Sequence, residues 1–296
     1  MFLPLETIIH KTPLGIRCRD AATLAPVTDG LRITATPLIG SVKTRVAFMS
    51  RSGAFAFEGL PGLRDQEYPV GEEAVASPPA GVKFAIQAED TLGRFLSWGM
   101  ELTLPRDEVI QALLFSAPAR PAATGLATIR GSLIEDGGAP AGHARISAQF
   151  SGVEMGAALA DARGQFVMFL PWPDPLRPPI GVPVTSPNTA GRQTLDSMEW
   201  PVTLSFFYQP STQKFICARP DGQIEIIVGQ TSPPDWRCAP DLKSLMEQQA
   251  ASVFPSTGGP PAPDMQVMIR FGQETIARPS APSGVIASSL RLLPAP

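Results

Sequence analysis

The residues best suited to acid–base or metal chemistry are few and widely spaced. His10 and His143 are the only two histidines, and neither belongs to a zinc motif such as His-Glu-x-x-His. We expect His143 to be a surface turn residue. Glu67, Glu72 and Glu73 could hold a cation, but such a cluster is more typical of a solvated acidic loop. The sequence therefore predicts no metal site and no cofactor.

The three cysteines, Cys18, Cys217 and Cys238, lack the Cys-x-x-Cys spacing of metal and redox sites. Cys217 and Cys238 could form a disulfide if two neighbouring strands brought them together. The alternative is three buried, reduced thiols in a protein made in the cytoplasm, and base rates favour this second interpretation.

Known catalytic motifs are also missing from the chain. It contains no Gly-x-Ser-x-Gly elbow and no phosphate-binding glycine loop. Asp90, Arg94 and Glu101 lie close in sequence, but we expect a turn in which Asp90 caps backbone amides and Arg94 lies at the surface. We therefore predict no catalytic residues and a protein that is not an enzyme.

Tryptophans are the remaining candidates for ligand contact. Trp98, Trp172, Trp200 and Trp236 could form a platform on which sugars stack, as in carbohydrate-binding β-sandwiches. The alternative is that each tryptophan seals a core or an interface. Of the four, Trp172 and Trp236 are our candidates for partner binding.

The composition predicts an all-β fold. The 33 prolines and 26 glycines are too many for a helical protein, while 44% apolar residues indicate a folded chain. Alternation of apolar and polar residues, as in Leu31/Ile33/Ala35, indicates strands with one buried and one solvated face.

Charge and hydropathy limit the partners and the location. The net charge of −3 and the lack of a basic cluster exclude nucleic acid as an expected partner. No apolar run approaches the ~18 residues of a membrane span. The segment Met1–His10 lacks the basic and apolar regions of a signal peptide. We expect synthesis in the cytoplasm and assembly into a particle that is either cytoplasmic or released.

An internal repeat organises the chain. A turn glycine, an aromatic strand and Leu-Pro occur in Arg51–Pro61 and again in Ala162–Pro171. A similar strand precedes each copy, Leu31–Ala35 in the first and Ala144–Ala148 in the second. A repeat of this size predicts two tandem β-sandwich modules of transthyretin/Ig-like type, with one short helix and extended N- and C-terminal arms.

Composition shifts place the boundaries. Linkers rich in proline, alanine or glycine follow each module, and a proline-rich insertion from Pro171 to Pro187 interrupts the second. The amphipathic segment Asp241–Phe254, with Asp241 as N-cap, is the predicted helix. The predicted parts are an N-terminal arm (1–14), a first module (15–115), a linker (116–125), a second module (126–255), and a linker, strand and tail (256–296).

The repeat resembles carboxypeptidase-regulatory-like (transthyretin-like) modules in Ser50–Pro61 and Asp161–Pro171. In those modules the glycine turn precedes a strand whose aromatic residues enter the core, and the proline ends it. The likeness implies a β-sandwich for two stretches of roughly 90 residues. It does not cover the C-terminal third.

The first module is also similar to β-rich proteins associated with phage-tail-like contractile injection systems, which have no known catalysis. The similarity lies in Gly15–Asp20, Val27–Leu31, Gly59–Glu67 and Glu89–Leu96, and Ser97 stands where a proline is expected. It implies a structural subunit of a contractile particle, located at the baseplate and acting through protein–protein contacts.

Two functions follow as expectations. In the first, a structural subunit, the arms bind other protein subunits of a large assembly by lying in grooves or adding strands to sheet edges. The alternative is a carbohydrate- or cell-surface-binding β-sandwich. The candidate partner-binding residues are Phe2, Leu5, Ile8, Ile9, Trp172, Trp236, Leu290 and Leu292.

Overall fold

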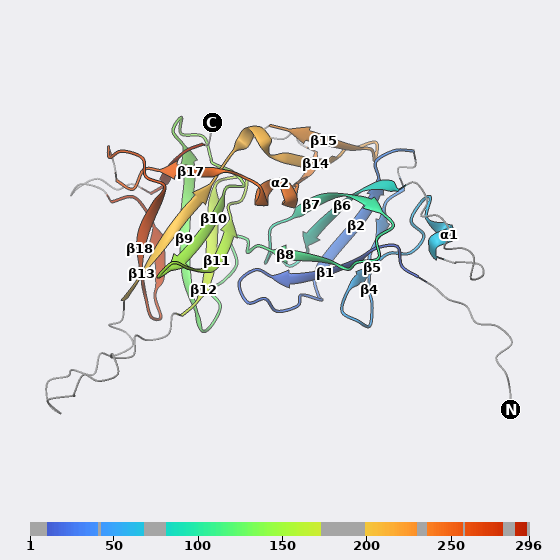
Figure 1. Cartoon of the computed structure of the whole chain (residues 1–296), viewed down its shortest axis with the longest axis horizontal. Coiled ribbons are helices and arrows are strands. Elements are labelled where there is room, and N and C mark those ends of the chain that lie inside the picture. Colours follow the sequence, from blue (N-terminus) through green and yellow to red (C-terminus); the bar gives the residue numbers. More distant parts are fainter. Residues whose placement is uncertain are drawn as a thin grey trace, which may run out of the picture. The chain divides into compact units, whose positions relative to one another are not determined.

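The computed structural model describes residues 11–40, 43–67, 81–172, 199–229, 236–256, 258–280 and 288–294. Within these ranges, helix is limited to α1 (Arg64–Glu67), α2 (Leu242–Met246) and one 3-10 turn (Pro210–Thr212), and the rest of the regular structure is β-strand (Figure 1). The predicted all-β class is therefore confirmed. No helix in the described ranges is long and apolar enough to cross a membrane.

The chain divides into two compact units, and each is built from two separate segments. Unit 1 comprises Met1–Leu114 and Ser211–Glu247, and unit 2 comprises Phe115–Pro210 and Gln248–Pro296. The segment 211–247 departs from the predicted boundaries, which placed it in the second module. Its strands pack against β7 of unit 1, a long-range contact that local composition does not reveal.

Two four-stranded sheets form the body of unit 1. Polar and apolar residues alternate along their strands, so that Ile33 and Ala35 are buried on one face while Arg32 is exposed on the other. One sheet has the order β4 (Phe48–Met49), β5 (Phe55–Ala56), β1 (Gly15–Asp20), β8 (Ile110–Leu114), and the other β3 (Arg45–Val46), β2 (Leu31–Pro37), β6 (Val82–Asp90), β7 (Trp98–Leu104).

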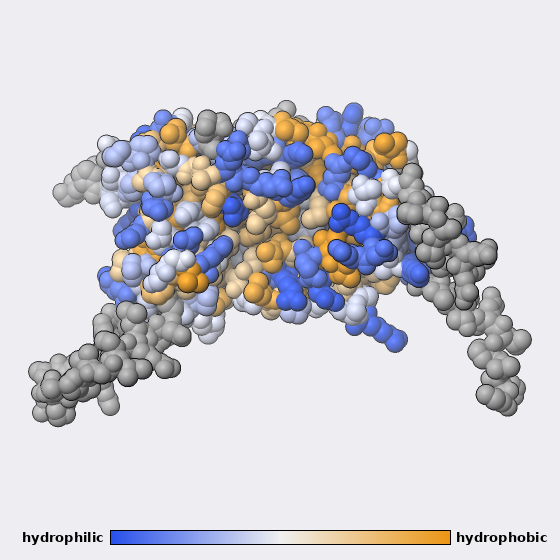
Figure 2. Space-filling model, in the orientation of Figure 1, coloured by the Kyte–Doolittle hydropathy of each residue, from blue (hydrophilic) through white to orange (hydrophobic). Residues whose placement is uncertain are grey.

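The segment 211–247 forms a third sheet, which we call the cap. Its strands are ordered β15 (Ile224–Val228), β14 (Lys214–Ala218), β16 (Arg237–Pro240), and α2 follows β16. Figure 2 shows hydrophobic residues at the surface where β14 and β15 lie in Figure 1, and Val228 is among the exposed ones.

The predicted helix Asp241–Phe254 is wrong in its second half. Asp241 is the N-cap, and its carboxylate accepts a 2.9 Å hydrogen bond from the Ser244 amide. Helix α2 ends at Met246, and Ala250–Val253 forms strand β17, which pairs with two neighbouring strands. Burial of Ala251 and Val253 in unit 2 outweighs the helical spacing of the sequence.

Unit 2 has one extended sheet around a single hydrophobic cluster. The path is β11 (Val153–Leu159), β10 (Arg145–Phe150), β13 (Glu199–Phe207), β17, β20 (Leu290–Leu293), β9 (Leu126–Glu135), β12 (Gln165–Pro171). Two more strands join it, β18 (Asp264–Arg270) beside β13 and β19 (Glu274–Ala277) beside β9.

The predicted extended C-terminal tail is wrong at β20. This strand pairs with β17 and, in parallel, with β9. Leu290 and Leu292 are completely buried in the core of unit 2, so they do not form a partner-binding arm. Two apolar side chains at alternate positions gain more from this burial than from exposure to solvent.

The same strand pairings occur in both units. Strand β1 pairs antiparallel with β5 and parallel with β8, and β9 pairs in the same senses with β12 and β19. The second sheet matches as well: β3–β2–β6–β7 in unit 1 corresponds to β11–β10–β13–β18 in unit 2, with every pair antiparallel.

The repeated glycine turns also have matching hydrogen bonds. Gly53 donates to the Ser50 carbonyl at 3.1 Å, and Gly164 donates to the Asp161 carbonyl at 3.0 Å. The Ser50 hydroxyl accepts from the Ala54 amide, as the Asp161 carboxylate does from the Gln165 amide. Both glycines have φ near +75°, a region in which a Cβ is strained.

Replacing these two glycines with alanine tests how tightly each copy of the turn is packed. An added Cβ meets nothing within 4 Å at Gly53, but at Gly164 it would lie 2.1 Å from the Leu133 carbonyl oxygen. We expect Gly53→Ala to lower the free energy of unfolding by about 1 kcal/mol through backbone strain alone. Gly164→Ala should cost about 3 kcal/mol. Urea denaturation measures both, and equal costs would contradict the packing difference.

Candidate ligand-binding groove

A polar groove of about 430 Å³ lies between the cap and the outer face of the sheet that contains β2 and β6. We call it the cap groove. All of its lining residues belong to unit 1. The sheet and its edges contribute Arg32, Thr34, Thr36, Thr44, Gln87, Ala88, Glu89 and Ser97, and the cap contributes Ala218, Gly222, Ile224, Arg237, Cys238 and Ala239.

The floor of the cap groove is made by alternation along two paired strands. Strand β2 buries Ile33 and Ala35, so the intervening residues Arg32 and Thr34 face outward. The antiparallel register places Arg32 opposite Glu89 and Thr34 opposite Gln87. The result is a row of hydroxyl, amide and charged groups on one face of the sheet.

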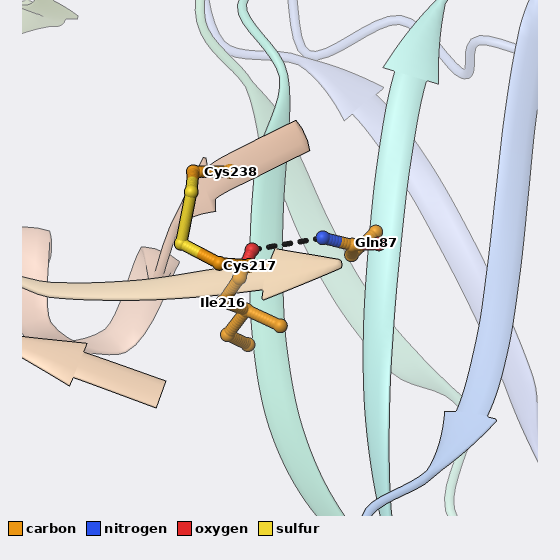
Figure 3. Close-up of a disulfide and its surroundings, with 4 residues drawn as sticks. All are labelled: Gln87, Ile216, Cys217 and Cys238. Atoms are coloured by element: carbon orange, nitrogen blue, oxygen red, sulfur yellow. Dashed lines mark hydrogen bonds between the residues drawn. A yellow bond between two sulfur atoms is a disulfide. The ribbon is translucent and has the colours of Figure 1, made fainter. Parts of the chain in front are cut away.

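The cap is held on this face by several contacts, which include a β-bridge from Asp241 to Gly99 and a hydrogen bond from the Glu101 amide to the Asp241 carboxylate. The Gln87 side-chain amide donates to the Ile216 carbonyl oxygen at 2.8 Å (Figure 3). Beside it, Ile216 lies directly over Gly99, where an added Cβ would be 3.0 Å from the Ile216 Cδ1 atom. The glycine therefore permits the close approach of the cap, and Gln87 adds a hydrogen bond across the contact.

A disulfide joins the two cap strands next to the groove. Cys217 of β14 and Cys238 of β16 are direct cross-strand neighbours, with Cα atoms 4.0 Å apart and a bond between their sulfur atoms (Figure 3). The sequence left open whether Cys217 and Cys238 form a disulfide or remain reduced thiols, and in the structure they form the disulfide. Cys18 is buried and free, and burial raises the pKa of its thiol to about 12, so it stays protonated.

The charged residues of the cap groove are two arginines and one glutamate. Arg32 and Glu89 come from the floor and Arg237 from the cap wall, and all three side chains are exposed. Among the described lining residues Glu89 is the only carboxylate, so these residues carry a formal net charge of about +1.

A smaller hollow of about 230 Å³ lies at the other end of the cap. It contains three lysines, Lys83, Lys214 and Lys243, together with Glu101 and Asp241. Lys83 pairs with Glu101 at 2.9 Å, and Lys243 lies 3.9 Å from Glu247. Because two of its lysines already have carboxylate partners, this hollow is the weaker candidate for a ligand site.

The predicted tryptophan platform does not form from the described residues. Trp172 packs against Trp200 and Phe271, with ring centroids 5.6 and 5.0 Å away, and lies at the core of unit 2. Trp236 is half-buried, with the Arg219 guanidinium 5.4 Å from its ring, and it does not line the cap groove. The predicted contacts Phe2, Leu5, Ile8 and Ile9 lie outside the described residues.

The predicted solvated acidic loop is wrong at Glu67. This residue is almost completely buried, and its carboxylate accepts 3.0 Å hydrogen bonds from the Gly59 and Leu60 amides. Glu72 and Glu73 lie outside the described residues. Glu67 therefore stabilises the Leu-Pro end of the first repeat, because its carboxylate satisfies two otherwise unpaired amide donors.

The predicted Asp90 turn is confirmed. The Asp90 carboxylate accepts from the Arg94 and Phe95 amides and from the Arg94 guanidinium. Burial raises the pKa of Asp90, but the hydrogen bonds from Arg94 outweigh that effect and leave the pKa below its usual range. Arg94 also contacts Asp29, whereas Glu101 pairs elsewhere, with Lys83.

His143 lies in a turn with φ of 61°, as the sequence predicts, but it is half-buried rather than fully exposed at the surface. Desolvation lowers its pKa to about 4, so the imidazole is neutral at pH 7. His10 lies outside the described residues. Across the described ranges, no three His, Cys, Asp or Glu side chains come close enough to hold a metal ion.

Sequence reasoning did not identify the cap groove. Its floor residues Arg32, Thr34 and Gln87 occupy the polar positions of alternating strands, which are normally read as a solvated face. Alternation does indicate that these side chains share one face. Nothing in the local sequence indicates that a segment more than 120 residues away covers that face.

Comparisons with known proteins do not assign the chain to a family. No family model and no curated protein matches it. A candidate adhesin from Bacteroides ovatus gives 7% identity and a TM-score of 0.17 over 90% of this chain and 93% of its own. A C-terminal fragment of the pilus adhesin SpaC from Lactobacillus rhamnosus GG has 10% sequence identity and a TM-score of 0.18. The match covers 93% of this chain and 99% of the fragment. Similarity this low carries no argument about fold or function.

Removal of the disulfide tests its role in holding the cap together. The bond links residues 21 positions apart, so replacing both Cys217 and Cys238 with serine should lower the free energy of unfolding by about 3 kcal/mol. Chemical denaturation, followed by the fluorescence of Trp236 in the cap, measures the loss. Reductant should lower the stability of the unmodified chain and leave the double variant unchanged. Reductant-insensitive stability in both proteins would contradict the disulfide.

Proposed function

We propose that the protein is a non-enzymatic binding protein that recognises carbohydrate at a cell surface through the cap groove. The observation that carries the proposal is the polar floor of the groove beneath a fixed cap. The Thr34 hydroxyl donates to the Gln87 main-chain carbonyl at 3.4 Å, and the Thr36 and Thr44 hydroxyls bond to each other at 2.9 Å. The hydroxyl oxygens have two lone pairs each and the Gln87 amide has a second N–H and a carbonyl oxygen, so these groups retain capacity for sugar hydroxyls. The apolar wall, including Ile224 and Ala218, offers contact area for the less polar faces of a sugar ring.

We further propose that the two units are copies of one β-sandwich module and that they serve as the scaffold for this site. The matched strand pairings and the matched glycine turns support a common origin. The second copy differs from the first by the long connection from β13 to β18, and the cap lies within that connection.

The absence of catalysis is part of the proposal. Hydrolysis of a glycosidic bond ordinarily requires two carboxylates on opposite sides of the bond. The described lining residues of the cap groove include one carboxylate, Glu89, and no histidine and no free cysteine. Such a set of side chains can hold a sugar but lacks a general acid–base pair.

The disulfide also supports a location at the cell surface. Disulfides persist in oxidising compartments and are uncommon in the reducing cytoplasm. A cross-strand bond between Cys217 and Cys238 suits a domain that works outside the cytoplasm, which is where a cell-surface ligand would be met.

A pair of threonine variants tests the groove as the binding site. Thr34→Val removes a groove hydroxyl with little change in volume, and Thr103→Val makes the same change on the same sheet in the hollow at the other end of the cap. On a glycan array followed by calorimetry, we expect Thr34→Val to weaken binding about fivefold and Thr103→Val to leave it unchanged. Lack of binding to any glycan would contradict the proposed function.

A structural subunit of a contractile injection particle is the second candidate function. The observation in its favour is the exposed apolar edge formed by β3 and β4, where Val46, Phe48 and Met49 are all exposed. Each strand is the edge of its sheet, and such an edge can accept a strand from a partner subunit. Mass spectrometry of purified native particles tests this function, and absence of the chain from intact particles would exclude it.

A further inference from the structure

The cap groove contains two arginines on opposite sides. Arg32 projects from the floor and Arg237 from the cap wall. Within the described residues neither guanidinium has a hydrogen-bonding or ion-pair partner. Arg94, by contrast, is held by both Asp90 and Asp29. The two groove arginines therefore have donors that a ligand can use.

In the part of the lining that the structure describes, the only opposing charge belongs to Glu89. It lies opposite Arg32 in the β2–β6 register, on the floor. No charged residue of β14 or β15 lines the groove, since those strands contribute Ala218 and Ile224. The positive charge of Arg237 on the cap wall is therefore uncompensated within the groove.

A guanidinium and a carboxylate fit one another as paired donors and acceptors, with two parallel hydrogen bonds. Neutral sugar hydroxyls can also accept hydrogen bonds from a guanidinium, but these bonds are weaker because the acceptor carries no charge. The groove thus combines neutral hydrogen-bonding groups, Thr34 and Gln87 among them, with donors for one anionic group.

We propose that the ligand of the cap groove is an acidic saccharide of the uronic acid class. Its carboxylate binds the Arg237 guanidinium with support from Arg32, and its hydroxyls bind the polar groups of the floor. This inference rests on the proposed function of the groove and specifies the class of sugar.

Calorimetry with a matched pair of probes tests the sugar class. The full chain, with its disulfide intact, is titrated with trigalacturonic acid and with its methyl ester, which differ in the charge of the carboxyl groups. We expect the acid to bind at least tenfold more tightly than the ester. Added salt should reduce this difference, because an exposed charge pair is screened.

Variants of the two groove arginines test whether these residues bind the carboxylate of the sugar. Arg237→Gln and Arg32→Gln should each weaken binding of the acid by about 10- to 100-fold and leave binding of the ester nearly unchanged. Arg163→Gln is the control, since it removes the same charge from an exposed turn of unit 2. Equal loss in the control variant would show a general charge effect and overturn the inference.

The outcomes separate this inference from the proposed function. If acid and ester bind equally well, and the binding is weakened by Thr34→Val, the groove is a saccharide site and the acidic class is wrong. If neither probe binds and the glycan array is blank, the proposed function fails and this inference fails with it.

Discussion

The contact between Ile216 and Gly99 is the constraint on which the candidate site depends. It places a β-hairpin directly on the polar face of a sheet, a surface that offers little hydrophobic driving force of its own. The absence of a side chain at Gly99 allows the approach, and the Gln87 amide adds a hydrogen bond to the Ile216 carbonyl. Without this contact, Arg32, Thr34 and Glu89 would be ordinary residues on an exposed sheet.

The two units share a set of strand pairings but connect the strands differently. In unit 1 the connection from β6 to β7 is a short turn closed by Asp90 and Arg94. The corresponding connection in unit 2, from β13 to β18, spans the cap, α2 and β17. The matched pairings are the same, and the units differ in this connection, in β20 beside β9 in unit 2, and in β4 beside β5 in unit 1. A loop can lengthen in this way at little entropic cost, since the cost of closure rises only slowly with length.

Local features of the fold could be predicted from the sequence. The alternation of Leu31/Ile33/Ala35, the glycine turns and the Asp241 N-cap depend on neighbouring residues, and these predictions are confirmed. The second half of the helix, the buried tail strand and the cap depend on partners far away in sequence. Ala250–Val253 is a strand because β13 and β20 flank it, and no local pattern contains that information. The candidate site was missed for the same reason, since its wall and floor come from distant segments.

The interleaved order of segments also has a consequence for synthesis on the ribosome. Unit 1 is translated up to Leu114, but its cap is not complete until Glu247, after β9 to β13 of unit 2 have been made. At 5–20 residues per second this is a delay on the order of ten seconds. During that interval the polar outer face of β2 and β6 is open to water, which it tolerates because its outward residues are largely hydrophilic. Polar side chains on this face therefore favour its hydration until the cap has been made.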